Sequence, residues 1–150
     1  MSRLRAKVSD LLSGAQLVGV TRLEHSWALE FDRVGLTTGT SWRMIKNGRL
    51  VLTSSDDGQK FGLHQPVDSE TQLQAALAGH QVTSCVVDPA TADLTLDFDE
   101  GSRLEILSTS IGYEAWQLNS AGSCIVAGNQ GRLSEATYAA PQVMIGGPWE

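Results

Sequence analysis

The sequence has few cysteines and no long apolar run. The first argues against a disulfide-bonded protein, and the second argues against a membrane protein. Its 150 residues include two cysteines, Cys85 and Cys124, and both lie in apolar segments. This setting favours buried, reduced thiols over a disulfide. No uninterrupted apolar run approaches the ~18 residues of a membrane span, and no apolar segment follows the basic N-terminus as a signal peptide requires. We therefore expect a cytoplasmic protein that makes no use of a membrane.

Sequence motifs of catalysis and cofactor binding are also missing. The chain contains no G-x-S-x-G elbow, no P-loop and no G-x-G-x-x-G. Its three histidines, His25, His64 and His80, have no partner at a metal-ligand spacing. Paired acids such as Asp97 and Asp99 fall at strand ends and turns, where carboxylates are usually solvated. We expect no cofactor, no metal site and no enzymatic activity.

Basic residues are outnumbered by acidic ones. The chain has 11 Lys and Arg against 17 Asp and Glu, a formal net charge of −6. An acidic surface repels phosphate backbones, so nucleic-acid binding is not expected, whereas a basic protein partner would be attracted. The hydrophobic fraction of 41% is ordinary for a globular protein, and the length suits one domain over residues 1–150.

Short matches recur in the same order along the chain. In chain order they are residues 12–17 with 77–82, residues 29–32 with 96–99, and Trp42 with Trp116. The offset grows from 65 to 67 and then to 74, which indicates insertions in turns, where added length costs little. We predict two diverged copies of one unit, with halves at about 2–58 and 69–133. The alternative is that turns and alternation make any β-rich chain resemble itself.

Each copy is expected to begin with a helix. Apolar spacing predicts a first helix over about residues 2–13, which Gly14 ends by accepting a left-handed backbone. Ser69 and Gln72 have the spacing of a capping box for the second helix, and Gly79 ends it.

Strands follow each helix. The expected strands are residues 17–23, 27–31, 41–45 and 50–53 in the first copy, residues 82–87, 94–98, 102–107, 113–118 and 124–127 in the second, and, more weakly, residues 142–145. Asn47-Gly48 is a strong hairpin signal, and short connections favour antiparallel pairing of neighbours. The polar residues 53–66 link the copies. The predicted fold class is α+β: an internally duplicated helix-plus-antiparallel-β-meander, with two helices packed on one or two β-sheets.

One loop of the second copy is longer than its counterpart. About seven extra residues fall between Phe98 and Trp116, around residues 108–112. A loop grown on one copy of a repeat often carries the binding face, although an ordinary long hairpin loop is the alternative. The candidate binding residues here are Ile111, Tyr113, Glu114 and Trp116.

The four tryptophans divide into two groups. Trp42 and Trp116 hold equivalent repeat positions, and Trp27 aligns with Leu94, so the repeat favours core roles for all three. Trp149 lies near the C-terminal end, after two glycines and a proline. A large aromatic side chain with an N–H group is useful at an interface, so Trp149 joins the candidate binding residues.

Residues 93–106 and 112–118 together resemble a family of small uncharacterised bacterial proteins, and Tyr113-Glu114-Ala115-Trp116 is the most specific element of the resemblance. Similar modules occur among immunity proteins of bacterial polymorphic toxin systems. The resemblance covers about residues 80–130. It implies a fold and a genomic context rather than a mechanism, and it carries over no catalytic residue. The first copy has Trp42 but no glutamate at the matching position.

Three functions remain open from the sequence. The first is a non-enzymatic protein-binding module of immunity-protein type, with a basic partner such as a toxin. The second is a small-molecule-binding protein or enzyme with a pocket between the repeat halves. The third is a homodimer joined through a sheet edge.

Overall fold

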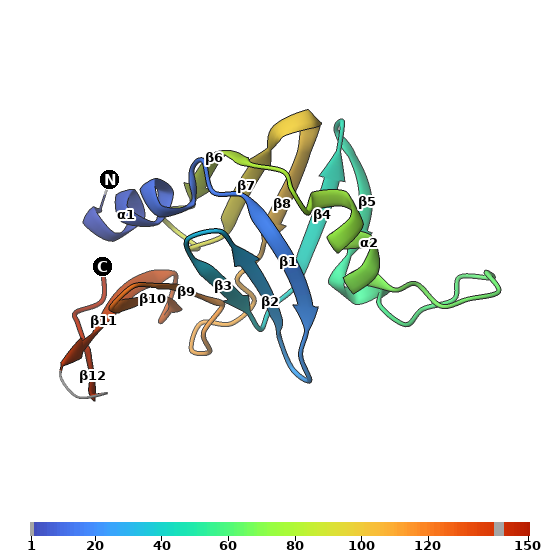
Figure 1. Ribbon diagram of the computed structural model, residues 1–150. Helices are drawn as coiled ribbons and strands as arrows, with labels where there is room; N and C mark the ends of the chain where they lie inside the picture. Colours follow the sequence, from blue (N-terminus) through green and yellow to red (C-terminus); the bar gives the residue numbers. More distant parts are fainter. Residues whose placement is uncertain (1, 140–142) are drawn as a thin grey trace.

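The computed structural model describes residues 2–139 and 143–150 (Figure 1). Over these residues the chain forms two α-helices, two 3-10 turns and twelve strands, and the strands make a seven-stranded and a five-stranded antiparallel sheet. The helices pack on the sheets, so the expected α+β class is confirmed.

Each half consists of one helix followed by five strands, and the 3-10 turns fall at different places. The first half contains α1 (Arg3–Leu12), β1 (Leu17–Arg22), β2 (Trp27–Phe31), β3 (Gly35–Thr38), β4 (Trp42–Lys46), β5 (Arg49–Thr53) and the 3-10 turn η1 (Ser54–Asp56). The second half contains α2 (Ser69–Leu77), β6 (Val82–Val87), β7 (Leu94–Phe98), the 3-10 turn η2 (Asp99–Gly101), β8 (Ser102–Ile106), β9 (Trp116–Ser120) and β10 (Ser123–Gly128). Two further strands, β11 (Arg132–Ala139) and β12 (Val143–Gly146), follow.

Each sheet is assembled from both halves of the chain. The strand orders are β1-β2-β3-β9-β10-β11-β12 and β6-β7-β8-β4-β5. The three strands after each helix therefore stay together, and the next two cross to the other sheet. The expectation that neighbouring strands pair throughout was wrong, because the connections from β3 to β4 and from β8 to β9 join different sheets.

The strand pairing of the two halves corresponds residue by residue at the phenylalanines. Leu17 pairs with Phe31, and Val82 pairs with Phe98. In both hairpins the register then shifts by one residue at the same place. The shared irregularity is a β-bulge, a local feature that is specific in position. The two aligned phenylalanines therefore hold equivalent places in the two sheets.

The tryptophans correspond in the same way. Thr38 pairs with Trp116, and Ile106 pairs with Trp42, at the points where strands of different halves meet. Trp27, Trp42 and Trp116 expose only 6%, 1% and 1% of their surfaces, so their predicted core positions are confirmed.

The halves also exchange their helices. α1 packs against β6 of the second half, and α2 packs against β1 of the first (Figure 1). Between the two contacts, Gln16 and Gln81 face each other in an isolated antiparallel bridge. Leu12 of α1 and Leu77 of α2 are fully buried in one continuous core. Each helix thus covers apolar residues that the other half supplies.

The start of α2 differs from its prediction. Asp68 is the N-cap, and its carboxylate accepts a hydrogen bond from the backbone N–H of Thr71 at 3.0 Å. Ser69, the predicted cap, is the first helical residue, and its buried hydroxyl donates to the carbonyl of Thr53 at 3.1 Å. The predicted capping box of Ser69 and Gln72 was therefore wrong, because the hydroxyl is used in a tertiary contact.

Two strands were not expected from the sequence, and one begins later than expected. β3 has four residues and starts at a glycine, and β11 lies in a tail where only residues 142–145 were expected to be extended. β12 occupies Val143–Gly146, while Gln142 lies outside the described residues. The expected strand over residues 113–118 starts only at Trp116.

Candidate functional site

The candidate binding residues of the second half lie on the connection between β8 and β9. It has nine residues, 107–115, whereas the corresponding connection from β3 to β4 has three, 39–41. Ile111 and Tyr113 on the longer connection expose 78% and 84% of their surfaces. Two large apolar side chains therefore stand in solvent on a segment that the first half lacks.

Hydrogen bonds hold this connection in place. The carbonyl of Ile111 accepts from the backbone N–H of Gln130 at 2.9 Å, which ties the loop to the turn after β10. The hydroxyl of Ser110 accepts from the backbone N–H of Tyr113 at 3.0 Å. Ordering before binding lowers the entropic cost of forming an interface.

Trp149 lies beside the same loop, although 36 residues separate it from Tyr113 in the sequence. A side chain at Gly128 would meet the Cα of Glu114 at 3.5 Å and the Cη2 of Trp149 at 3.7 Å. Trp149 is 40% exposed. Four of the five candidate residues therefore gather around the turn after β10, and we call Ile111, Tyr113, Glu114 and Trp149 the loop–tail surface.

The tail that carries Trp149 is fixed at its end. The backbone of Glu150 exchanges two hydrogen bonds with Leu133 of β11, at 2.9 and 2.7 Å. The Glu150 carboxylate accepts from the backbone N–H of Leu4 at 3.2 Å and pairs with Arg3 at 3.3 Å. A carboxylate at a helix N-terminus is electrostatically favourable. This contact has no local signal in the sequence, because it joins residues at opposite ends of the chain.

Trp116 belongs to the core and not to the loop–tail surface. It is 1% exposed, and its Nε1–H donates to the carbonyl of Ala92 at 2.8 Å. The predicted core role of Trp116 is therefore confirmed, and its burial leaves it out of the loop–tail surface. Tyr113 lies in a bend before β9 begins.

A groove of about 540 Å³ lies beside the loop–tail surface. It runs over the face of β9, β10 and β11 that points away from the core, and we call it the outer groove. Its apolar lining comes from Cys124, Val126, Ala136, Met144 and Trp149, and its polar lining comes from Glu114, Gln117, Asn119 and Ser134.

Both cysteines of the described chain are free and buried, and neither has the character of a nucleophile. Burial raises the pKa of Cys85 to about 12. Burial, and then the charge of Glu114, raises the pKa of Cys124 above its ordinary value. Since the thiolate is the reactive form, both thiols are held in the unreactive state.

The acids near strand ends are engaged in ion pairs. A side-chain hydrogen bond from Arg103 lowers the pKa of Asp97. The backbone N–H of Gln81 and the ring of His80 lower the pKa of Asp99. His80 is therefore half-buried and paired rather than free in an exposed turn. Carboxylates held in the ionised form are poorly suited to acid catalysis at neutral pH.

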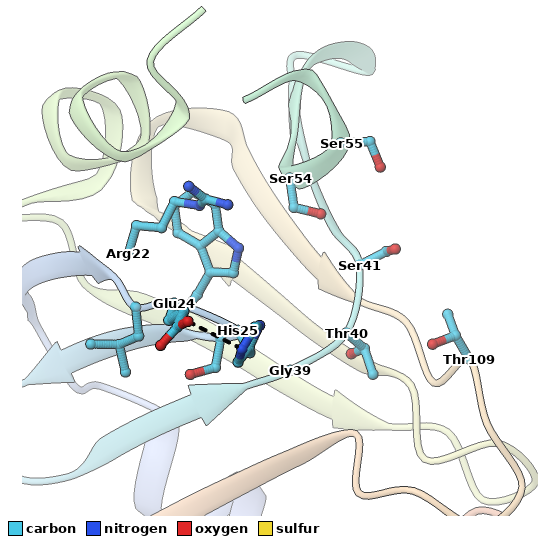
Figure 2. Close-up of a pocket in the computed structure, with 12 residues that line it drawn as sticks. Arg22, Glu24, His25, Gly39, Thr40, Ser41, Ser54, Ser55 and Thr109 are labelled. Atoms are coloured by element: carbon cyan, nitrogen blue, oxygen red, sulfur yellow. Dashed lines mark ion pairs between the residues drawn. The ribbon is translucent and has the colours of Figure 1, made fainter. Parts of the chain in front are cut away.

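A second cavity opens at the end of the first half (Figure 2). It has a volume of about 320 Å³ and is bordered by the turn from β1 to β2, by residues 39–41 and by the start of η1. Figure 2 shows hydroxyl groups of Thr40, Ser41 and Ser54 on one side, with Arg22 and His25 on the other. We call it the polar pocket. The sequence analysis placed a pocket between the halves, but this lining comes from the first half except for one threonine.

An unpartnered indole N–H belongs to a tryptophan that packs against the lining of the polar pocket. Trp27 lines the pocket and packs edge-on against Trp42, with ring centroids 5.1 Å apart. The buried Nε1 of Trp42 finds no hydrogen-bond partner among the described residues. The equivalent Trp116 finds its acceptor, Ala92, in a six-residue turn, whereas the matching turn of the first half has four residues. The shorter turn removes the acceptor and leaves Trp42 unsatisfied.

Two kinds of site were not found. In residues 2–139 and 143–150, no cluster of three or more His, Cys, Asp and Glu side chains could hold a metal ion. Neither helix in this part of the chain combines the length and apolar character that crossing a bilayer requires.

Residues 12–137 match a protein family described as "Family of unknown function (DUF6188)". The chain belongs to this family. The match begins at the last residue of α1, includes β1 to β10 with the loop of Ile111 and Tyr113, and ends before β12 and Trp149. Comparison with curated proteins and with solved structures gives no match. Membership of DUF6188 therefore places the chain in a family without assigning it an activity.

Proposed function

We propose that this DUF6188 chain is a non-enzymatic protein-binding module that receives its partner at the loop–tail surface. The observation that carries the proposal is the exposure of Ile111 and Tyr113, 78% and 84%, on a hydrogen-bonded loop. Exposed apolar groups that cluster on a fixed loop are typical of protein-binding sites, and a central aromatic side chain commonly dominates the binding energy.

A basic partner, as expected for an immunity protein that blocks a toxin, is the second part of the proposal. It is supported by the net charge of −6 and by the carboxylate of Glu114, which forms no ion pair within the described chain. Opposite charges on two partners speed their diffusional encounter, and this effect weakens as the salt concentration rises. The two buried free thiols suit a cytoplasmic location.

We also infer that the two halves descend from one duplicated unit. The identical strand orders and the equivalent pairings of Phe31 with Leu17 and Phe98 with Val82 support this. On this view the loop–tail surface is the place where one copy acquired residues that the other never gained.

The test is affinity capture from the native host with three forms of the purified chain. These are the wild type, the loop variant Ile111→Ser/Tyr113→Ser, and the control variant Leu50→Ser/Val51→Ser, which removes two exposed apolar side chains of β5. We expect one dominant basic protein with the wild type and with the control, and at least a tenfold loss with the loop variant, or about 1.4 kcal/mol. Equal recovery with the loop variant would contradict the proposal, as would the absence of any enriched protein.

A ligand-binding role for the polar pocket is the second candidate. The specific observation in its favour is that Trp27, which lines this hydroxyl-rich pocket, packs against Trp42, whose buried Nε1–H has no partner among the described residues. A buried donor without a partner costs about 1–3 kcal/mol, which an added acceptor could recover. A panel of small polar compounds would be tested for raising the melting temperature of the wild type but not of Arg22→Ala. No difference across the panel would remove this candidate.

A further inference from the structure

The segment between the halves forms a projecting hairpin. We call residues 58–67 the finger, and Figure 1 shows it extending away from both sheets. Its base is closed by two backbone hydrogen bonds, from Gly58 N–H to the Val67 carbonyl at 2.8 Å and from Val67 N–H to the Gln59 carbonyl at 2.7 Å. The expected polar linker is thus a shaped element.

The tip of the finger has an unusual backbone. Leu63 N–H donates to the carbonyl of Lys60 at 2.7 Å, and the two residues between them, Phe61 and Gly62, have φ angles of +46° and +79°. Two positive φ angles are typical of a type I′ turn, which Asn-Gly satisfies easily. A left-handed conformation at a bulky residue such as Phe costs about 1–2 kcal/mol.

The tip also places large apolar side chains in solvent. Phe61 and Leu63 are 69% and 60% exposed. The left-handed backbone at Phe61 and the exposure of its side chain do not stabilise this chain. A shorter polar turn would join the halves without the backbone strain or the exposed apolar surface. These features therefore point to a contact with another molecule.

The charges of the finger set it apart from the rest of the chain. Residues 58–67 contain no Asp or Glu, and they carry Lys60 and His64, in a protein of net charge −6. The finger is thus an apolar tip flanked by basic groups. Its complement is an apolar recess with a carboxylate at the border.

The outer groove has these properties. Val126, Ala136 and Met144 give it an apolar strip beside the polar side chains of Gln117, Asn119 and Ser134, and its volume of about 540 Å³ lies in the range of ligand pockets. At its border, Glu114 accepts a hydrogen bond from Gln117 at 2.6 Å, and no cation pairs with it in the part of the chain that the structure describes. Lys60 next to an inserted Phe61 would supply that cation.

We propose that the finger of one copy of this chain docks into the outer groove of a second copy. The finger and the outer groove lie at opposite ends of the molecule (Figure 1), so the finger cannot reach the groove of its own chain. The contact is head-to-tail: every copy offers one finger and one groove, and association continues until a ring closes. The proposal does not depend on the proposed function, although a partner at the loop–tail surface would compete for Glu114 and Trp149.

The test is sedimentation velocity of the purified full chain over a concentration series from about 1 to about 300 µM, where contacts of modest affinity become populated. The wild type should show species larger than the 16.1 kDa monomer, growing with concentration. The finger variant Phe61→Ser/Leu63→Ser and the groove variant Ala136→Trp should both remain monomeric. The control Leu50→Ser/Val51→Ser should assemble like the wild type.

Mixing the two defective variants gives the decisive result. Finger-variant molecules keep a working groove, and groove-variant molecules keep a working finger, so the mixture should form a one-to-one dimer and nothing larger. A wild type that stays monomeric throughout the series overturns the proposal, and so does a finger variant that assembles normally. If circular dichroism shows that Ala136→Trp does not fold, the finger variant and its control still decide whether the finger mediates assembly. The loop variant Ile111→Ser/Tyr113→Ser should assemble normally, which separates this test from that of the proposed function.

Discussion

At the residue scale, the paired tryptophans show how equivalent positions come to differ. Trp42 and Trp116 hold the same place in the strand pairing and are equally buried. Only Trp116 has an acceptor for its indole N–H, because the turn that carries Ala92 is two residues longer than its counterpart. The hydrophobic role of a residue thus follows from its own position, while its hydrogen bond depends on the length of a neighbouring turn.

Glu135 gives a prediction at the same scale. It pairs with Lys7 and with Arg3 of α1, and the hydrogen bond from Lys7 is the main reason that its pKa is lowered. A lowered pKa in the folded state stabilises the fold above the unfolded value of about 4.3, and this contribution is lost as the pH falls through the folded pKa. Glu135→Gln should therefore reduce the free energy of unfolding by about 1 kcal/mol near pH 7.

Urea unfolding at about pH 7 and at about pH 3 would test this, because the stabilisation by a carboxylate of lowered pKa declines as the pH falls below its unfolded pKa, so the difference should shrink. Glu24→Gln is the matched control, since the Glu24 side chain is 88% exposed and its contact to His25 is 3.6 Å long. An equal loss for Glu135→Gln at both pH values would show that the ion pairs do not stabilise the contact of α1 with β11.

At the element scale, segments with a clear apolar periodicity or a turn signal were predicted correctly. Elements that depend on tertiary contacts with distant residues were not. The helix over about residues 2–13 and the Asn47-Gly48 hairpin follow from local signals and are confirmed. β3 was missed because four residues carry too little pattern, and it is a strand because β2 and β9 lie on either side. The cap of α2 moved from Ser69 to Asp68 because Thr53 offers an acceptor that no local sequence reveals.

The candidate site was predicted in part for the same reason. The longer loop with Ile111 and Tyr113 is visible in the offsets between the halves. Its nearness to Trp149 depends on β11 and β12, which bring the tail back across the sheet. The finger was taken as a polar linker because its two hydrogen-bonded ends and positive φ angles have no signal in composition.

At the scale of the whole molecule, neither half is a folding unit. Each sheet needs strands of both halves, and each helix covers the strand of the other half. A half alone would expose sheet edges and the apolar faces that the exchanged elements cover. The chain should therefore unfold in a single cooperative step, with both halves lost together.

Fragments 1–60 and 64–150, separated within the finger, should each be largely unfolded by circular dichroism and should regain the native spectrum when mixed. The cut lies in an exposed hairpin tip, where chain breaks are tolerated best. The control is a cut within β8, after Leu104, whose fragments should not recover because that strand pairs on both sides. A separate fold in either fragment of the first pair would contradict an exchanged architecture.

The sequence by itself determined the α+β class, the helices, most strands and the buried tryptophans, because these depend on periodicity and side-chain type within short windows. It also located the loop that one half has and the other lacks. The tertiary structure alone decided the exchange of strands between sheets, the meeting of Trp149 with the loop–tail surface, and the projection of the finger. The first two are contacts between residues far apart in the chain, and their energies depend on which surfaces meet rather than on any local pattern. The third depends on backbone hydrogen bonds at the base of a turn, which composition does not reveal.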